Sequence, residues 1–208
     1  DRQNQGHLFA KKQSYSRFLR SLRRIERDKY VKAVIFRFGG LAVSMSTAVG
    51  MSRAIANLKK KGKRTYALLE TATTSDYVVA LGCQHISMIP AGMLYLPGVR
   101  ASALYFKKFL DTFGLAGDFV AVGDFKTAPE PFMRETMSVY RRKQLNRLVT
   151  DLYLFLVDYI VKNRPSKKLT IAKVKAAIDR ALHSPQSALT AGLIDAMVHR
   201  KTLRSRVR

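Results

Sequence analysis

Gly123-Asp124-Phe125-Lys126-Thr127-Ala128-Pro129-Glu130-Pro131-Phe132 lies between an apolar run and a long helical pattern. The apolar run, residues 118–122, predicts a β-strand that leads into this loop. Prolines fix φ and favour extended geometry in the preceding residue, so we expect Lys126 to project from a rigid loop at a strand's end. Lysines act as general bases when burial or neighbours lower their pKa. In a chain this basic, however, most lysines are solvated surface charges, so the loop alone does not assign Lys126 a role.

The charge balance of the chain is unusual for a globular protein. Its 208 residues include 38 Lys and Arg against 14 Asp and Glu, a formal net charge of +24. The hydrophobic content of 47% is enough for a folded core. Repulsion among so many positive charges opposes folding. The usual reason why a chain keeps such a charge is that it binds a polyanionic partner. Because the charges are spread along the chain, we expect the partner to be nucleic acid. An anionic membrane surface is the other partner that the charge allows.

Several residue counts limit the function classes. The single cysteine, Cys83, excludes an intrachain disulfide and a Cys-rich zinc site. The four histidines lack metal-ligand spacing, so we expect no metal or cofactor. No run of eighteen apolar residues occurs, which predicts no transmembrane segment. The first residue is Asp, from which we expect a processed or partial chain with a removed targeting segment.

Apolar spacing predicts alternating strands and helices in the first half of the chain. The expected elements are a basic helix 14–28, a strand 31–38, a helix from Ser46 to the run 59–64, a strand 65–69, a turn 70–76, a helix 77–81 and a strand 85–89 stopped by Pro90. The first helix is open to two interpretations, a helix packed on the domain or an arm for RNA or lipid. Two β–turn–helix–β units in succession predict an α/β fold with a largely parallel sheet.

The second half is predicted to be mostly helical. Helices are expected at 101–113, 145–160 and 171–182, followed by a short helix with Ser184 as its N-cap and Pro185 at its first position. The cations 141–143 lie in the first turns of the long helix, where the helix dipole disfavours them unless an outside anion compensates. The tail 199–208 has five cations and no acid, and such tails are normally disordered without a partner.

Four stretches of the chain carry a resemblance to a known family. The most specific runs from Leu104 through Phe109-Leu110 to the loop ending at Phe132, and the others are 32–37 with the glycine pair that follows, 77–81 with 86–90, and 187–195. Together they resemble the signal peptide peptidase A (protease IV) family of the ClpP/crotonase superfold. The resemblance implies a ClpP/crotonase-like α/β domain at 30–198, built from repeated ββα-type units. A basic helical arm at 1–29 and a basic tail at 199–208 would flank it.

In that family a serine attacks the peptide carbonyl, a lysine is its base, and glycine-loop N–H groups bind the oxyanion. The resemblance therefore implies Lys126 as general base and Gly39 and Gly40 as oxyanion loop. The family's Ser-Gly-Gly run reads Thr74-Ser75-Asp76 here, so Thr74 or Ser75 occupies the nucleophile position without the glycines. A carboxylate beside a developing oxyanion is electrostatically unfavourable.

Long family members are tandem duplications in which one half supplies the lysine and the other the serine. This chain resembles the lysine-supplying half. Two interpretations follow. One is a catalytically inactive, RNA-binding structural subunit of a large assembly, such as an organellar ribosome in the mitochondrial or another organellar matrix. The other is a serine–lysine peptidase subunit that takes its serine from a neighbouring homologous subunit.

The RNA-binding interpretation predicts which Lys and Arg side chains contact phosphates, because phosphate recognition relies on these two residue types. The candidates are Arg20, Arg23, Arg24, Lys59, Lys60, Lys61, Lys63, Arg64, Arg141, Arg142, Lys143, Arg200, Lys201 and Arg204. Such contacts give salt-dependent affinity without base specificity.

Overall fold

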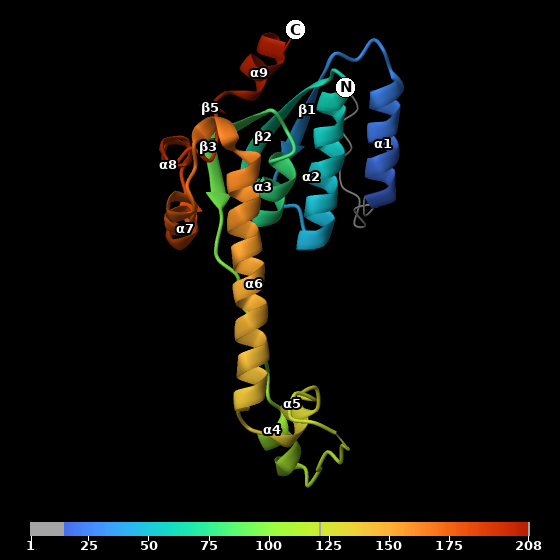
Figure 1. Cartoon of the computed structure of the whole chain (residues 1–208), viewed down its shortest axis with the longest axis vertical. Helices are drawn as coiled ribbons and strands as arrows, with labels where there is room; N and C mark the ends of the chain where they lie inside the picture. The colour runs from blue at the N-terminus through green and yellow to red at the C-terminus, as the bar shows by residue number, and fades with distance from the viewer. Residues whose placement is uncertain (1–14, 121, 208) are drawn as a thin grey trace. The chain divides into compact units, whose positions relative to one another are not determined.

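The structure is a computed structural model that describes residues 15–120 and 122–207, apart from the side chains of residue 166 and residues 204–207. The chain divides into two compact units (Figure 1). The sheet unit comprises the chain up to Pro97 and from Ile160 onward, and the helical unit comprises Gly98–Tyr159. The expected division into a basic arm at 1–29, a domain at 30–198 and a basic tail at 199–208 stays a prediction.

The sheet unit is built on one mostly parallel sheet in the order β1-β2-β3-β4, with β5 also paired to β3. β1 pairs with β2, β2 with β3, and β3 with β5 in parallel, whereas β4 is antiparallel to β3. The predicted α/β fold with a largely parallel sheet is therefore confirmed. The strands are β1 (Ala33–Phe38), β2 (Arg64–Ala72), β3 (His85–Tyr95), β4 (Leu182–His183) and β5 (Ala196–Met197).

The expectation that Pro90 ends the third strand is wrong. β3 continues to Tyr95, but its register with β2 shifts: Leu69 pairs with Met88 and Thr71 with Met93. The extra β3 residues form an irregularity that contains Pro90, and a proline is tolerated there because no ladder hydrogen bond is required of it.

Two helices lie side by side over the sheet, α2 (Met45–Lys60) and α3 (Thr74–Ala80) (Figure 1). Ser44 caps α2 by accepting a hydrogen bond from the Thr47 N–H. Ile55 and Leu58 on α2 are buried, as are all of the α3 residues from Asp76 to Ala80. Gly82, just after α3, lies so close to the Ser52 carbonyl of α2 that a side chain at position 82 would collide with it. The glycine therefore allows the end of α3 to approach α2 closely.

The first described helix, α1 (Tyr15–Arg27), packs alongside α2 through buried Leu22 (Figure 1). This supports the interpretation of a helix packed on the domain. Its remaining face carries the arginines and is exposed to solvent. Residues 1–14 of the expected basic arm lie outside the described residues.

The C-terminal part of the sheet unit contains η1 (Pro165–Lys167), α7 (Ile171–Arg180), α8 (Pro185–Thr190) and α9 (Arg200–Val207). The expected caps of α7 and α8, Thr170 and Ser184, both accept N–H bonds from the first turn. Basic tails of this kind are normally disordered without a partner, but residues 200–207 form α9. Leu203 packs against Leu68 and Val198 in a small apolar cluster, so the tail has a partner within the sheet unit.

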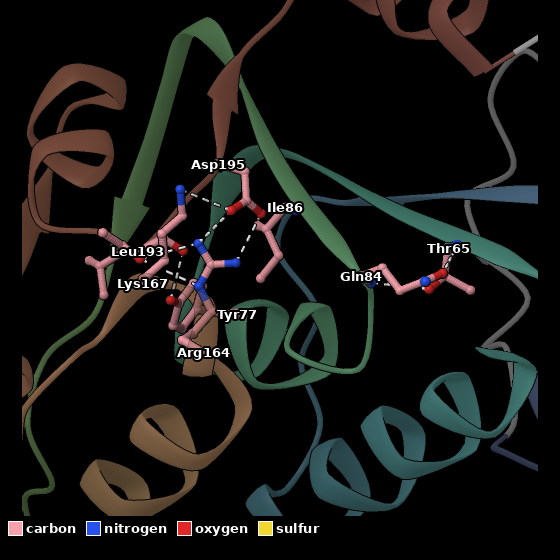
Figure 2. A network of polar contacts seen from close by, with 9 residues as sticks. Thr65, Tyr77, Gln84, Ile86, Arg164, Lys167, Leu193 and Asp195 are labelled. Carbon is pink, nitrogen blue, oxygen red and sulfur yellow. Dashed lines mark hydrogen bonds and ion pairs between the residues drawn. The ribbon is translucent and has the colours of Figure 1, made fainter. Parts of the chain in front are cut away.

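A buried ion pair fixes this C-terminal part to β3 (Figure 2). Arg164, which is 4% exposed, donates two hydrogen bonds to the Asp195 carboxylate at 2.9 and 3.0 Å. Asp195 also accepts a bond from Ile86 N–H at 2.8 Å and pairs with Lys167 at 3.2 Å. The buried Tyr77 hydroxyl donates to the Leu193 carbonyl at 2.8 Å. These contacts join α3, β3, η1 and the segment after α8.

The helical unit contains α4 (Lys107–Thr112), α5 (Glu130–Met133) and α6 (Val139–Asn163) as far as Tyr159. The expected helix 101–113 is shorter than predicted, and residues 118–120 and 122 are not in a strand. A strand requires a hydrogen-bonded partner, and within the described part of this unit the segment has none. Phe132 stacks with Phe106 and Phe119, each at 5.9 Å between ring centroids, and orders the surrounding loops.

Candidate active site and basic surface

The expected oxyanion loop and nucleophile position follow two neighbouring parallel strands. The loop 39–41 comes directly after β1, and Thr73 follows the end of β2. Because parallel strands end at the same edge of a sheet, the loop and the first turn of α3 are adjacent. Gly40 has φ of 81°, a left-handed conformation that favours glycine.

The Asp76 carboxylate occupies the N–H groups of this loop. Asp76 is 0% exposed, and its two oxygens accept hydrogen bonds from Gly40 N–H at 3.1 Å and from Leu41 N–H at 3.1 and 3.2 Å. Charged acceptors form strong bonds with backbone donors. Two amides that could hold a developing oxyanion are therefore already bound to an internal anion.

The same carboxylate also begins α3. The N–H and hydroxyl groups of Thr73 donate to Asp76 Oδ2 at 2.8 and 2.9 Å, and the Thr73 hydroxyl oxygen accepts a bond from Asp76 N–H at 3.5 Å. This reciprocal capping box satisfies otherwise unpaired groups at the start of the helix. It explains why α3 begins at Thr74, three residues before the predicted start at Tyr77. The expected turn 70–76 is correspondingly shorter, because β2 extends to Ala72.

The two candidate nucleophiles lie in the first turn of α3. Thr74 and Ser75 are both half-buried, and the Ser75 hydroxyl donates to the Val43 carbonyl at 3.1 Å. Within the described residues, neither hydroxyl has an ionisable base as a hydrogen-bond partner. A hydroxyl needs such a base to become a nucleophile at neutral pH.

Lys126 lies in the helical unit on a loop that α6 holds in place. Its N–H donates to the Gly123 carbonyl at 3.1 Å. Gln144 donates to the Phe125 carbonyl at 2.9 Å, and Arg141 donates to the Thr127 carbonyl at 2.6 Å. The carbonyls before and after Lys126 are therefore both fixed, and its exposed side chain projects from an ordered loop.

The Lys126 loop forms one wall of an open, mostly apolar hollow of about 680 Å³. Val120 and Val122 contribute to it and are 95% and 83% exposed. The hollow is of the size that accommodates a peptide side chain or small molecule. Its lining residues are Val120, Val122, Phe125, Lys126, Thr127, Ala128, Pro129, Arg141, Gln144 and Leu145.

The structure separates the expected phosphate contacts into exposed cations and cations with internal partners. The exposed ones are Arg20, Arg23, Arg24, Lys59, Lys60, Lys61, Arg64, Arg142, Lys143 and Lys201. Lys63 does not belong to the surface, because it is 8% exposed and its ammonium group donates to the Asp28 and Val31 carbonyls. Arg141 holds the Thr127 carbonyl, as described above. The Arg204 side chain lies outside the described residues.

Arg200 also has an internal role. It donates to Glu70 at 2.7 Å, and Arg37 donates to the same oxygen at 2.8 Å, so this pairing attaches α9 to β2. The hydrogen bond from Arg37 is the main reason why the pKa of Glu70 lies below its ordinary value. Arg200 is therefore only partly available to an external anion.

The exposed arginines of α1 and the cations at the end of α2 form one surface, which we call the α1–α2 basic surface. Arg20, Arg23, Arg24 and Arg27 share one shallow hollow on α1. Glu26 of α1 pairs with Lys61 at 3.5 Å, so the C-terminal end of α1 lies next to Lys61. Arg64 N–H donates to the Lys32 carbonyl at 3.0 Å, which places it at the same end. This surface can contact successive phosphates.

Sequence reasoning missed the partners of two acidic residues. The pattern Thr73-x-x-Asp76 is a capping-box signal, and it could have located the start of α3. Nothing in the sequence linked Asp76 to the loop 39–41 or paired Asp195 with Arg164, because these pairs are separated by more than thirty residues.

No group of three or more His, Cys, Asp or Glu in the described part of the chain could hold a metal ion. Among the helices described, none is long and apolar enough to cross a membrane.

Comparison with known proteins identifies the family. A sequence model of Peptidase family S49 matches residues 57–208. Protease 4 of Haemophilus influenzae is 30% identical over 155 residues, which cover 72% of this chain and 25% of that protein. Protease 4 of Salmonella typhi is 28% identical over 114 residues, 55% of this chain and 18% of that protein. This chain belongs to Peptidase family S49, and it spans a quarter or less of these two relatives.

A solved structure supports the fold. A mutant of the 1510-N membrane-bound stomatin-specific protease aligns with a TM-score of 0.58 over 92% of this chain and 76% of that one. The sequences are 14% identical, so the match concerns the fold alone. The expected resemblance to the protease IV family is confirmed, and the structural match supports the expected α/β fold.

Proposed function

We propose that this chain is a family S49 member without peptidase activity of its own, and that it binds RNA through the α1–α2 basic surface. The observation that carries the first part is the Asp76 carboxylate on the Gly40 and Leu41 N–H groups. An oxyanion site works by offering unoccupied donors in the direction where negative charge develops. A fixed carboxylate uses those donors and repels a second anion.

The hydroxyl groups at the nucleophile position support the same conclusion. Ser75 donates to the Val43 carbonyl, which cannot accept the proton that an attacking hydroxyl must lose. Thr74 lies within the capped first turn of α3. Neither group is therefore activated within the sheet unit.

The RNA-binding part of the proposal is supported by charge and exposure. Cations from α1 and from the end of α2 are adjacent, whereas the acid between them, Glu26, already pairs with Lys61. Binding to phosphates releases counterions, so affinity decreases steeply with salt and carries no base specificity. An RNA-rich assembly such as an organellar ribosome fits a net charge of +24.

Salt-dependent binding of labelled RNA tests this proposal. We expect Arg20→Gln with Arg24→Gln to weaken binding and to reduce the slope of log K against log salt by about 0.7 for each lost contact. The control pair, Lys173→Gln with Arg180→Gln on α7, removes the same charge from another exposed surface. Equal loss in both pairs, or RNA binding that does not depend on salt, contradicts the proposed surface.

A second function is favoured by the Lys126 loop. Because α6 fixes the carbonyls on both sides of Lys126 and an apolar hollow adjoins it, this loop can present a lysine to another chain. In this alternative the chain supplies the general base to a homologous subunit that bears the serine.

A serine-directed acylating probe distinguishes the two functions. The purified chain is incubated with the probe and with unfolded peptides, with and without a serine-bearing homologue. We expect no labelling and no cleavage by the chain alone. Labelling of Thr74 or Ser75 that disappears in Lys126→Ala would overturn the proposal of an inactive chain. Labelling of the homologue's serine that requires Lys126 would establish the alternative.

A further inference from the structure

An exposed aromatic residue lies at the turn between α1 and β1. Tyr30 is 83% exposed, although a tyrosine ring normally gains stability by burial. The backbone of Tyr30 is held without help from the ring, because the Tyr30 N–H donates a hydrogen bond to the Asp28 carboxylate at 2.8 Å. The ring is therefore available to an outside partner.

The turn that presents Tyr30 is fastened from inside the sheet unit. Lys63 is buried and donates to the Val31 carbonyl at 2.8 Å and to the Asp28 carbonyl. Both carbonyls lie within two residues of Tyr30. Because these bonds restrain the backbone on each side, the ring is held outside the core, and a partner would not need to order the turn first.

The surroundings of the ring are cationic. The Lys29 ammonium lies 5.7 Å from the centre of the Tyr30 ring, within the range of a cation–π contact. Lys32 begins the chain segment after the turn, and Arg27 ends the helix before it; both are exposed. Tyr30 thus continues the α1–α2 basic surface and adds an aromatic face to it.

A basic surface that includes an accessible aromatic ring fits single-stranded nucleic acid. Unpaired bases stack on aromatic side chains while their phosphates contact nearby cations. In duplex RNA the bases are stacked on each other, and recognition relies on shape, phosphates and 2′-hydroxyl groups. A ring such as Tyr30 would therefore add affinity only for unpaired bases.

We propose that Tyr30 stacks on an unpaired base of single-stranded RNA whose phosphates contact the α1–α2 basic surface. This inference rests on the proposed RNA binding and adds which form of RNA the surface selects. Lys29 lies over the ring, and its positive charge contacts the neighbouring phosphate.

Binding of a labelled short oligouridine and of a labelled RNA duplex of equal length tests the inference by fluorescence anisotropy. We expect Tyr30→Ala to weaken oligouridine binding by about tenfold and to leave duplex binding within about twofold. Tyr30→Trp should retain oligouridine binding, because tryptophan also stacks. Tyr30→Ala removes no charge, so the salt dependence of both complexes should stay unchanged.

The outcomes separate this inference from the proposed function. If the wild-type chain binds neither RNA, both are wrong. If it binds RNA but Tyr30→Ala has no effect, or weakens both forms equally, the stacking role is wrong while RNA binding stands. Tyr30→Ala should unfold at the same urea concentration as the wild type, which verifies that the exposed substitution leaves the fold intact.

Discussion

Replacing Asp76 with alanine removes the carboxylate that joins the loop 39–41 to α3. Three backbone N–H groups then lose their acceptor: those of Gly40, Leu41 and Thr73. The bond from Thr73 N–H is the Asp76 half of the α3 capping box, whereas the cap made by the Thr73 side chain remains. We therefore expect Asp76→Ala to destabilise the sheet unit.

The size of the effect follows from these groups. An unsatisfied buried donor costs roughly 1–3 kcal/mol. Gly40 is exposed and Leu41 half-buried, so water can partly replace the lost acceptor. Taking the lower end of about 1 kcal/mol for each of the three N–H groups gives a total of about 3 kcal/mol.

Urea unfolding measures this difference, with Asp179→Ala as the control. Asp179 is exposed and lies in the last turn of α7, where a negative charge is unfavourable to the helix dipole. The same substitution should therefore change stability by less than about 0.5 kcal/mol there. If Asp76→Ala is as stable as Asp179→Ala, the carboxylate does not hold the loop.

Added formate provides a second test of the Asp76→Ala variant. The vacated N–H groups form a site for a small carboxylate, and a ligand at ten times its Kd stabilises the folded state by about 1.4 kcal/mol. We expect Asp76→Ala to be more stable in formate than in a sulfonate salt at the same concentration. The stability of the wild type should be the same in both salts. Equal stabilisation of both proteins would contradict occupation of the loop by Asp76.

Further predictions concern other parts of the sheet unit. Arg164→Met removes two hydrogen bonds to the Asp195 carboxylate, which keeps Lys167 and the Ile86 N–H, and should destabilise the protein by about 2–3 kcal/mol in calorimetry, whereas Arg147→Met, in an exposed pair, should cost less than about 1 kcal/mol. Similar losses for both would show that burial does not decide the effect. Burial acts to raise the pKa of Asp195, but bonds from Arg164 and a backbone N–H outweigh it and hold the pKa below its ordinary value of 3.8. Its stabilising contribution is therefore complete above pH 3.8 and is lost as pH falls through the lower folded value, so the stability gap between wild type and Asp195→Asn should narrow in acid titrations of urea midpoints. A gap independent of pH would exclude this linkage. Burial raises the pKa of the Cys83 thiol, so a thiol reagent should label it in urea and not in native buffer; rapid native labelling would contradict its burial.

Local signals in the sequence predicted the elements whose stability is local. Thr170 and Ser184 cap their helices as expected, because a cap is defined by residues within one turn. The long helix around 145–160 was also correct, since its apolar period persists over many turns.

The wrong predictions involve contacts with distant residues. The segment 118–122 has strand-like composition, but composition cannot provide the neighbouring strand that pairing requires. The sequence left the order of the basic tail open, because order there depends on a partner. That partner is an apolar cluster of Leu68 and Val198, which Leu203 joins from a distant part of the sequence.

The candidate site shows the same limit. The sequence identified the Thr74-Ser75-Asp76 run and suggested that its carboxylate is unfavourable to catalysis. It could not show that the carboxylate binds Gly40 and Leu41, because this requires the ends of β1 and β2 to be brought together. Lys63 illustrates the converse, since a lysine within a basic run was expected on the surface and instead has two internal acceptors.

The way in which α6 holds the loop of Lys126 separates the shape of that loop from the chemistry of its lysine. The bonds from Arg141 and Gln144 end on main-chain oxygens, so they persist whatever side chain stands at position 126. Substitutions there can add or remove a proton acceptor without remodelling the backbone. A single substitution at position 126 can therefore remove or restore a general base during evolution while the fold stays the same.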